Sequence, residues 1–380
     1  MMTYRLVMVP SFIRALLVTL SVMTMPGLSS ADVGGVLTLP AYGPFNGNLN
    51  QLNVAEIINH QVSAPASLRI TVVRDSGETV STRDISVPAG GVSHIIVNEF
   101  IDAQGRGIND SYGLIKIEKI GSADPIITAH TSFYKLPAGS QTPEFAFVIP
   151  FQDAQVGQSF GMYNSINPGI GGQPVANFIS IANPATSLFT GALQLYNQDG
   201  SAGTRSAISI PSGGRMDFPA GHPNGMVTGT FEIIPDSGAQ PYISFSARYA
   251  AADLPGNYNF GFSLATHPGS CNETLPASTM GYGTNNWVEI GNLGSTPKSV
   301  TVEVRSRNGT LAHSQVLEIP ARGQGNFHSN PHIGDQNVGS VKVVCSPGDP
   351  ILVQSAFYSR PSEGSPVVTS AYVSQARGLT

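Results

Sequence analysis

The sequence predicts an all-β protein made of three tandem antiparallel β-sandwich domains of about 110 residues each, after a cleaved signal peptide. Three observations predict this class. Short runs rich in β-branched residues alternate with turns throughout a chain that contains 42 Gly and 28 Pro. The same order of strands and turns occurs three times. An apolar segment with basic residues stands at the N-terminus.

Each copy begins with a strand that ends in Asn, and an alternating strand with a tight turn follows. The Asn-terminated strands are residues 54–59, 178–183 and 287–292. The turns close on Gly77, Gly200 and Gly309. Asp-Gly and Asn-Gly pairs supply the positive φ angles that tight hairpins require. The three copies therefore predict the same hairpin in each domain.

The second arm of each hairpin stops at a proline, because proline cannot donate a hydrogen bond to a sheet and so ends a strand or lies at an edge. These prolines are Pro88, Pro211 and Pro320. Two further strands follow, and the second closes on a tyrosine in each copy: Tyr134, Tyr249 and Tyr358. A tyrosine that recurs near a strand end is interpreted first as structural, like the corner tyrosine of immunoglobulin-type sandwiches.

A last β run follows each copy, and the third of these runs has no repeat after it. We therefore assign the run to the end of each unit, as the second arm of a hairpin. The predicted boundaries are a signal peptide at 1–31, then β-sandwich repeats at 32–151, 152–266 and 267–380.

The N-terminus predicts export. Arg5 and Arg14 make the start basic, residues 15–23 are apolar, and small residues precede a cleavage site after Ala31. The alternative, a buried or membrane-anchoring helix, is less favoured because the apolar run is short. No later segment is apolar enough to span a bilayer. The expected location is extracellular or at the cell surface, with the periplasm as an alternative.

The charge balance disfavours nucleic acid as a partner. The chain has 19 Lys and Arg against 24 Asp and Glu, a net charge of −5, and removal of the leader makes it more acidic. Charged residues make up only 11% of the chain. A surface of low charge suits packing against copies of the same chain or against polysaccharide.

Two cysteines, Cys271 and Cys345, both belong to the third unit. In an oxidising compartment they are expected to form a disulfide, and the alternative is two buried free thiols. No C-x-x-C motif is present, so a metal or redox site is not predicted.

The candidates for metal binding are weak. His328 and His332 are separated by three residues, with Asp335 nearby, which on a helix would present two imidazoles to one metal. Pro331 and Gly334 favour a solvated loop instead. Asp102, Asn109 and Asp110 could supply oxygen ligands to calcium, but a polar turn is favoured. We predict no metal and no cofactor.

Catalytic motifs are not evident either. No nucleophile elbow of the G-x-S-x-G type is predicted, although residues 157–161 match the letters of that motif, and Ser, His and Asp residues are scattered. Trp287 is the only tryptophan, and it aligns with Val54 and Phe178 of the other copies. We therefore interpret it as a core residue rather than as a platform for a sugar ring. These observations predict a protein that is not an enzyme.

In strand order and turn placement the chain resembles the tandem immunoglobulin-like or fibronectin type III-like modules of bacterial secreted and surface proteins. The first two units lack the paired cysteines and central tryptophan of antibody domains. The resemblance implies a role in spacing, adhesion or self-assembly.

Three classes of function remain. The leading hypothesis is an exported structural or adhesive protein that contacts itself, another surface protein or polysaccharide. A free strand edge at the C-terminus could pair with a neighbouring chain, through Val367, Val368, Tyr372 and Val373. The alternative is an array of carbohydrate-binding modules. The third is a secreted hydrolase with a site between domains.

Overall fold

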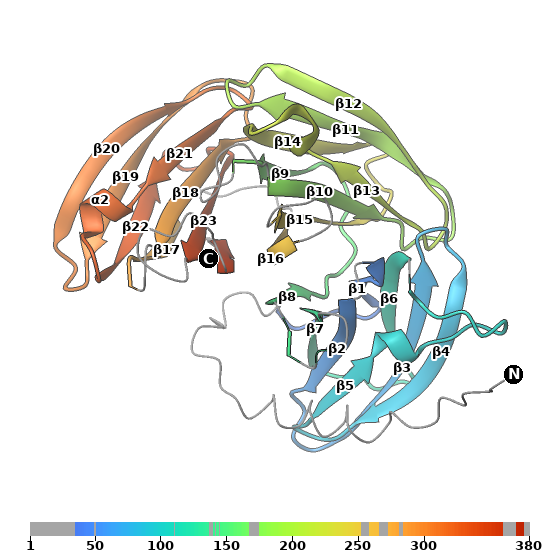
Figure 1. The fold of residues 1–380 in the computed structure, drawn as a ribbon. Coiled ribbons are helices and arrows are strands. Elements are labelled where there is room, and N and C mark those ends of the chain that lie inside the picture. The colour runs from blue at the N-terminus through green and yellow to red at the C-terminus, as the bar shows by residue number, and fades with distance from the viewer. Residues whose placement is uncertain are drawn as a thin grey trace, which may run out of the picture. The chain divides into compact units, whose positions relative to one another are not determined.

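The computed structural model describes residues 35–48, 51–109, 111–136, 140, 142–143, 145–166, 175–251, 258–265, 273–280, 284–359 and 370–375. The predicted signal peptide lies outside these residues, as do Cys271, Val367, Val368 and Asp110. All described residues belong to one compact unit. Within them the chain forms four-stranded antiparallel sheets, six in number (Figure 1), which confirms the predicted all-β class.

The sheets come in pairs that follow the chain, and we call them the first, second and third sheet pair. The first sheet pair has the strand orders β1-β6-β3-β4 and β5-β2-β7-β8. Its strands are β1 (Ala41–Asn46), β2 (Gln51–Asn59), β3 (Ala66–Arg74), β4 (Thr79–Val87), β5 (Val92–Ile96), β6 (Tyr112–Lys119), β7 (Ile127–Lys135) and β8 (Phe145–Pro150), with the 3-10 helix η2 (Val97–Glu99) after β5.

The second sheet pair repeats this topology with the strand orders β12-β11-β14-β9 and β13-β10-β15-β16. Its strands are β9 (Ser159–Asn164), β10 (Val175–Ala182), β11 (Phe189–Asn197), β12 (Ala202–Ile210), β13 (Arg215–Pro219), β14 (Thr228–Pro235), β15 (Ile243–Ala251) and β16 (Tyr258–Ala265), with η3 (His222–Asn224) after β13.

The third sheet pair has the orders β17-β22-β19-β20 and β21-β18-β23-β24. Its strands are β17 (Glu273–Ser278), β18 (Asn285–Asn292), β19 (Lys298–Ser306), β20 (Leu311–Ile319), β21 (Gln324–His328), β22 (Val338–Val344), β23 (Ile351–Ser359) and β24 (Ser370–Gln375), with α2 (Asn330–Ile333) after β21. The last run of each unit pairs with the strand before it, as β8 with β7. Whether each sheet pair is a separate domain stays a prediction.

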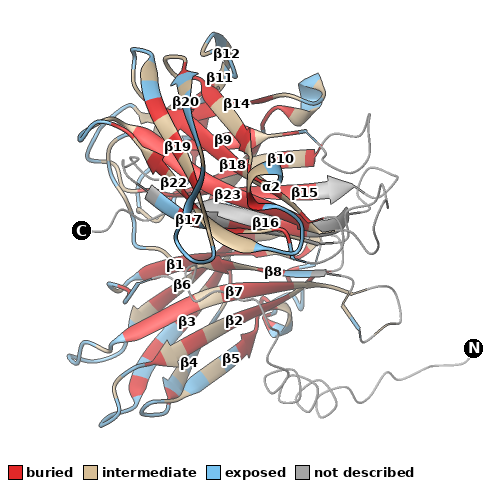
Figure 2. Ribbon diagram, turned by 90° about the vertical axis from the view of Figure 1, so that its left-hand side faces the viewer, coloured by how far each residue is buried: buried red, intermediate tan, exposed pale blue. Residues whose placement is uncertain are grey.

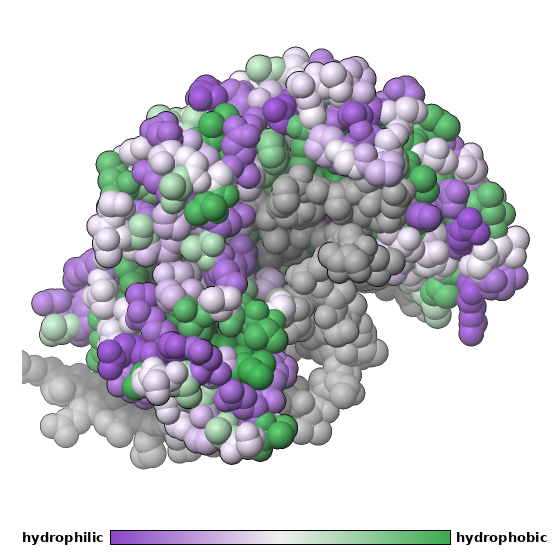
Figure 3. Space-filling view, turned by 180° about the vertical axis from the view of Figure 1, so that it is seen from behind, coloured by the Kyte–Doolittle hydropathy of each residue, from purple (hydrophilic) through white to green (hydrophobic). Residues whose placement is uncertain are grey.

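A hydrophobic core lies between the two sheets of each pair. In the first sheet pair Leu68 and Ile70 of β3 pack with Ile57 of β2 and Ile127 of β7, and each has 0% exposure. Equivalent clusters occupy the second and third sheet pairs. Figure 2 shows that exposed residues gather at the turns, while buried residues run along the strands. On the face in Figure 3, hydrophilic and hydrophobic residues are interspersed.

The hairpins β3-β4, β11-β12 and β19-β20 close on glycines with positive φ. The φ angle is 87° at Gly77, 82° at Gly200 and 84° at Gly309. A register shift occurs near the turn in all three hairpins. The turn chemistry of the sequence thus corresponds to the same backbone path in each copy.

The asparagines that end β2 and β18 and follow β10 have one shared role. Asn59, Asn183 and Asn292 are almost completely buried. The amide of Asn183 donates to the carbonyl oxygens of Ser187, Ile210 and Pro211 at 2.7, 3.0 and 3.1 Å. Asn59 and Asn292 donate to the equivalent carbonyls. Each Asn therefore holds the proline turn against the end of its strand.

The loop predicted around Pro331 is wrong in one respect, because residues Asn330–Ile333 form a single helical turn. Pro331 stands in the first turn, where its fixed φ fits a helix and its missing N–H is not needed. The N–H of Gly334 donates to the carbonyl of Asn330, and Gly334 has φ 79°. The proline that suggested a loop therefore starts a helix.

Candidate functional site at the junctions between sheet pairs

Consecutive sheet pairs meet at two junctions, which we call the first and second junction. Each begins where a hairpin tip of one pair lies on the proline turn of the next. In the first junction the N–H of Arg215 donates to the carbonyl of Asp75 at 2.9 Å. In the second the N–H of Gln324 donates to the carbonyl of Gln198 at 3.0 Å. The same backbone contact is therefore built twice.

Glycines make this close approach possible. A Cβ on Gly77 would lie 2.2 Å from the carbonyl oxygen of Ser212, and one on Gly200 would lie 1.9 Å from that of Ala321. On the receiving side, a Cβ on Gly214 would lie 2.7 Å from the carbonyl oxygen of Asp75. These glycines thus serve both the turn and the contact between sheet pairs, and the sequence indicated only the turn.

Arg215 is the central polar residue of the first junction. Its side chain is 4% exposed and pairs with Asp217 at 2.9 Å. Its Nη1 donates to the carbonyls of Phe45 and Gly113 in the first sheet pair, at 3.0 and 3.2 Å. Its guanidinium also lies over the ring of Tyr112, 5.1 Å from the centroid. One side chain therefore satisfies groups from both sheet pairs.

The second junction contains a buried ion pair between Arg248 of β15 and Glu289 of β18. Both side chains are 0% exposed, and the two N···O distances are 2.9 and 2.8 Å. Asn164 of β9 also donates to Glu289 at 2.7 Å, and so does Gln354. Burial alone would raise the pKa of Glu289, but the charge and hydrogen bonds of Arg248 hold that pKa below its ordinary value.

Arg322 completes the second junction from the turn between β20 and β21. Its guanidinium lies over the rings of Phe160 and Tyr196, 5.3 and 5.7 Å from their centroids, and 3.8 Å from the Glu232 carboxylate. The hydroxyl of Thr230 donates to the Arg322 carbonyl at 2.5 Å. A positive-φ backbone at Arg322 (58°) accompanies these contacts.

Apolar side chains also join the sheet pairs. Tyr42 and Leu114 pack with Ala182 and Ile243 in the first junction. A larger cluster brings Phe133, Phe147 and Ile149 against Phe245, Ala247 and Tyr249. In the second junction Met162 packs with Leu293 and Leu352. Apolar contacts therefore accompany the polar contacts at both junctions.

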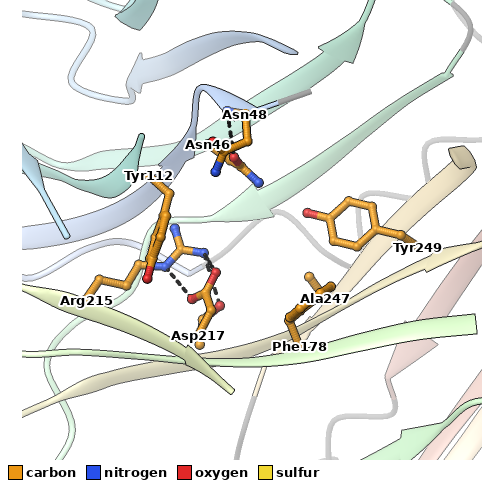
Figure 4. Close-up of a pocket in the computed structure, with 9 residues that line it drawn as sticks. Asn46, Asn48, Tyr112, Phe178, Arg215, Asp217, Ala247 and Tyr249 are labelled. Atoms are coloured by element: carbon orange, nitrogen blue, oxygen red, sulfur yellow. Dashed lines mark hydrogen bonds and ion pairs between the residues drawn. The ribbon is translucent and has the colours of Figure 1, made fainter. Parts of the chain in front are cut away.

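Each junction also contains a pocket. The pocket of the first junction has a volume of about 260 Å³ (Figure 4). Its lining residues are Asn46, Asn48, Tyr112, Phe178, Ser180, Arg215, Asp217, Ala247 and Tyr249. The pocket of the second junction measures about 190 Å³ and is lined by Asn164, Ile166, Asn285, Trp287, Asn326, His328 and Tyr358.

The two pockets occupy equivalent places. Phe178 pairs with Ala247 across β10 and β15, and Trp287 pairs with Ala356 across β18 and β23. Each pocket therefore has three equivalent lining residues. They are an aromatic residue (Phe178 or Trp287), a tyrosine that recurs in each unit (Tyr249 or Tyr358), and the asparagine that ends β1 or β9 (Asn46 or Asn164). Figure 4 shows the ring of Tyr249 across the pocket from the Arg215–Asp217 pair.

Trp287 is less buried than its interpretation as a core residue predicts. Its ring stacks on the imidazole of His328, with 4.5 Å between centroids and 15° between planes. It also packs against a cluster that contains Val175, Ala356 and Tyr358. The side chain is partly buried and lines the pocket, so it lies between a hydrophobic cluster and solvent.

The predicted metal candidates have different neighbours. His328 contacts Trp287, whereas His332 stacks on His313 at 3.7 Å and on Phe327 at 5.3 Å. Asp335 is exposed. Burial and a neighbouring imidazole lower the pKa of both His328 and His332. Among the described residues, no three His, Cys, Asp or Glu side chains could hold a metal ion together.

Asp102 has cationic partners rather than an open oxygen site. Its carboxylate lies 3.0 Å from Arg74 and 2.7 Å from Arg106, and it accepts the N–H groups of Gln104 and Arg106. Asn109 is exposed, and Asp110 lies outside the described residues. Asp102 therefore organises its own loop.

The C-terminal candidates are only partly described. Cys345 is 8% exposed and belongs to the core of the third sheet pair; because Cys271 lies outside the described residues, the disulfide stays a prediction. Strand β24 pairs with β23, and Val373 is 6% exposed in a cluster with Val175 of the second sheet pair. Val373 is therefore not an exposed edge residue. Only the backbone of Tyr372 is described.

The sequence reasoning missed Arg215, Arg248 and Glu289. Arg248 is the one charged residue in a run of apolar and small residues from 241 to 251, and that isolation is the signal that could have found it. A second missed group consists of three side chains in a row on neighbouring strands of one sheet. Glu56 of β2 lies 3.5 Å from His94 of β5 and 3.6 Å from His130 of β7. Glu56 and Glu289 occupy equivalent strand positions.

Comparison with known proteins does not identify a family for this chain. No family model matches the chain, and no curated protein matches it. Among solved structures it is similar to a crystal structure of a tetra-tandem repeat in the extending region of a large adhesion protein. That match has 8% identity and a TM-score of 0.13, and it covers 89% of this chain and 99% of the other. A likeness at this level carries no argument about function.

No helix within the described ranges has the length and apolar character needed to cross a membrane.

Proposed function

We propose that this chain is a non-enzymatic, exported structural or adhesive protein whose sheet pairs act as one body. The observation that carries the proposal is the repeated junction, in which a hairpin tip lies on the next proline turn through one backbone hydrogen bond. A protein that spaces or holds other components needs its repeats at fixed positions, because flexible linkers between the repeats would let the distance between those components vary.

The chemistry of the junctions supports this role. Arg215 donates hydrogen bonds to two backbone carbonyls of the first sheet pair and to the side chains of Ser180 and Asp217 in the second. The Arg248–Glu289 pair is excluded from solvent. A buried charge whose partner is removed is strongly destabilising, so the two sheet pairs are held in one register. The low content of charged residues, 11%, is also typical of a surface made for contact.

The location and the role can be tested separately. Antibody labelling of intact cells that make the full chain should detect it at the surface or in the medium. Purified protein immobilised on beads should then promote their attachment to cells or to polysaccharide-coated glass. Labelling only after lysis would contradict export. Surface labelling without any attachment or assembly would contradict the adhesive role and leave a spacer.

A second candidate is saccharide binding in the junction pockets. It is favoured by the aromatic ring and the amide side chains that both pockets share, because sugars stack on aromatic faces and exchange hydrogen bonds with amides. A glycan array with the purified chain would test it, with Trp287→Leu and Phe178→Leu as paired variants. Binding that survives both substitutions would exclude these pockets as the binding site.

The hydrolase hypothesis has less support from these pockets. The first pocket contains Ser180 beside Arg215, which hydrogen-bonds it at 3.1 Å, and the second contains His328 stacked on Trp287. In the two described pockets, a serine, an imidazole and a carboxylate do not come together in one lining.

A further inference from the structure

The third hairpin tip has the form of the two docked tips, but within the described residues it meets no receiving turn. Gly309 donates to the carbonyl of Ser306 at 2.8 Å, as Gly200 does to Asn197 at 2.9 Å. Its φ of 84° matches the 82° of Gly200. Yet a Cβ on Gly309 would meet nothing within 4 Å in the described part of the chain, whereas one on Gly200 would strike Ala321.

The first proline turn has the form of the two receiving turns, but no hairpin tip from the described part of the chain lies on it. Gly91 donates to the carbonyl of Pro88 at 3.0 Å, just as Gly214 does to Pro211 at 2.9 Å. The atoms nearest to a Cβ on Gly91 all belong to Pro88, whereas a Cβ on Gly214 also meets the docked Asp75. Pro88, Ala89 and Gly90 of this turn are exposed.

The residue after this turn is Val92, which stands where Arg215 and Gln324 stand in the other sheet pairs. Val92 begins β5, the edge strand of its sheet, and it is 50% exposed. In the two junctions the equivalent residue donates its backbone N–H to the hairpin tip. Val92 therefore has the place in the fold from which Arg215 and Gln324 donate to a hairpin tip, and its side chain is exposed.

We propose that the tip Ser306–Gly309 of one copy docks on the turn Pro88–Gly91 of a second copy. The carbonyl of Arg307 accepts the N–H of the second copy's Val92, as Asp75 accepts that of Arg215. The geometry comes from the two junctions already inside the chain, so the contact continues an established interface. Because the two surfaces differ, the contact is head-to-tail and closes into a ring or continues as a filament.

The strands beside the third hairpin tip offer fewer apolar side chains than those at the internal junctions, so we expect this contact to be weaker. Thr274 and Pro276 of β17 occupy the positions of Phe160 and Met162 of β9, and both are exposed. Lys342 occupies the position of Glu232. Fewer apolar side chains are buried, so we expect association that depends on concentration rather than a permanent oligomer.

Charge favours the same pairing. The tip side carries Lys342 and Arg307, and the receiving side carries Glu56 at the register position of Glu289. Two imidazoles, His94 and His130, face that carboxylate, and Ser132 donates to it at 2.6 Å. In the second junction the equivalent carboxylate accepts a hydrogen bond from the preceding sheet pair, through Asn164.

The first test measures mass by light scattering over a range of protein concentrations. The unaltered chain should increase in mean mass as concentration rises, and Gly309→Asn should remain monomeric. Asn tolerates the left-handed backbone, so this variant adds a side chain to the tip without straining the turn. Gly348→Asn is the matched control, because Gly348 has φ 82° with nothing within 4 Å of a Cβ, and it should behave like the unaltered chain.

A second pair of variants tests the hydrogen bond itself. Val92→Pro removes the N–H at an edge strand and should abolish association, whereas Val92→Ala keeps it and should associate. Chains with Asn308→Cys mixed with chains with Ala89→Cys should cross-link through a short bis-maleimide, and each chain alone should not cross-link above the level of the unaltered protein.

A constant monomer mass for the unaltered chain, or equal association of Gly309→Asn and Gly348→Asn, would overturn the proposal. The inference deepens the proposed structural role, but its test does not measure adhesion. If the chain does not self-associate, the proposed adhesive role is not affected. If the chain self-associates but does not adhere, only the proposed function is contradicted.

Discussion

Arg248 and Glu289 belong to different sheet pairs and form a bidentate ion pair with both side chains at 0% exposure. Taking two charges out of water is unfavourable, and their attraction offsets this only when the geometry is good and the remaining groups are hydrogen-bonded. Asn164 and Gln354 supply those additional bonds to Glu289. The pair therefore makes the second junction specific: any other placement of the third sheet pair leaves a buried charge unpaired.

Glu289→Gln should destabilise the chain by about 3–5 kcal/mol, because it leaves the Arg248 guanidinium buried without its counter-charge. Denaturant unfolding followed by fluorescence of Trp287 measures this change. The double variant Arg248→Met with Glu289→Met should lose less stability than Glu289→Gln alone. A loss below about 1 kcal/mol for the single variant would show that the pair is not buried in solution.

Acid should lower the stability of the fold through the carboxylate of Glu289. The folded pKa of Glu289 lies below the ordinary value of 4.5, since the Arg248 charge outweighs burial. Its contribution is therefore present above about pH 4.5 and is lost as the pH falls through the folded pKa. The unfolding midpoint, measured from pH 6 downward, should fall less steeply in Glu289→Gln. Parallel curves for the two proteins would contradict this prediction.

His222 should produce a separate pH dependence at higher pH. Burial lowers its pKa below 6.5, and its Nδ1 accepts the N–H of Asn177 at 3.0 Å. Protonation turns that acceptor into a donor, so the stability it contributes is present above pH 6.5 and decreases as the pH falls below it. His222→Asn keeps an acceptor and should remove this part of the profile. Thermal unfolding between pH 5 and 8 provides the measurement.

Gly200→Ala and Gly309→Ala separate the two roles of the turn glycines. Both place a Cβ on a left-handed backbone, which costs about 1 kcal/mol. Only the first drives that Cβ into a neighbouring carbonyl, at 1.9 Å. Gly200→Ala should therefore be less stable than Gly309→Ala by about 1–3 kcal/mol in denaturant unfolding. Equal losses would mean that the second junction is open in solution.

Asn183→Ala should destabilise the second sheet pair by about 3 kcal/mol, because three carbonyls, of which that of Ile210 is buried, lose their donor. Asn308→Ala at an exposed hairpin turn is the control and should change stability by less than about 1 kcal/mol. Hydrogen exchange of the amides near Pro211 would localise the effect. Unchanged exchange there would refute the role assigned to Asn183.

The sequence predicted the local elements well because their causes are local. Gly77 and Pro211 indicate turns through their own backbone properties, and the alternation of apolar and polar residues in 70–74 indicates a half-buried strand. The junctions could not be predicted in the same way. Nothing near Gly200 in the chain shows that Ala321 will lie against it, and Arg248 meets Glu289 only after two sheets have formed. Pro331 did not distinguish a loop from a helix start, because proline is compatible with both a loop and the first turn of a helix.

The match between hairpin tip and proline turn has a consequence for how such a chain can change length. Every copy carries a tip at one side and a turn at the other, so a duplicated copy inserted between two existing ones would find both of its neighbours already complementary. Gene duplication could thus lengthen or shorten the protein in steps of one unit, with no new contact needing to arise.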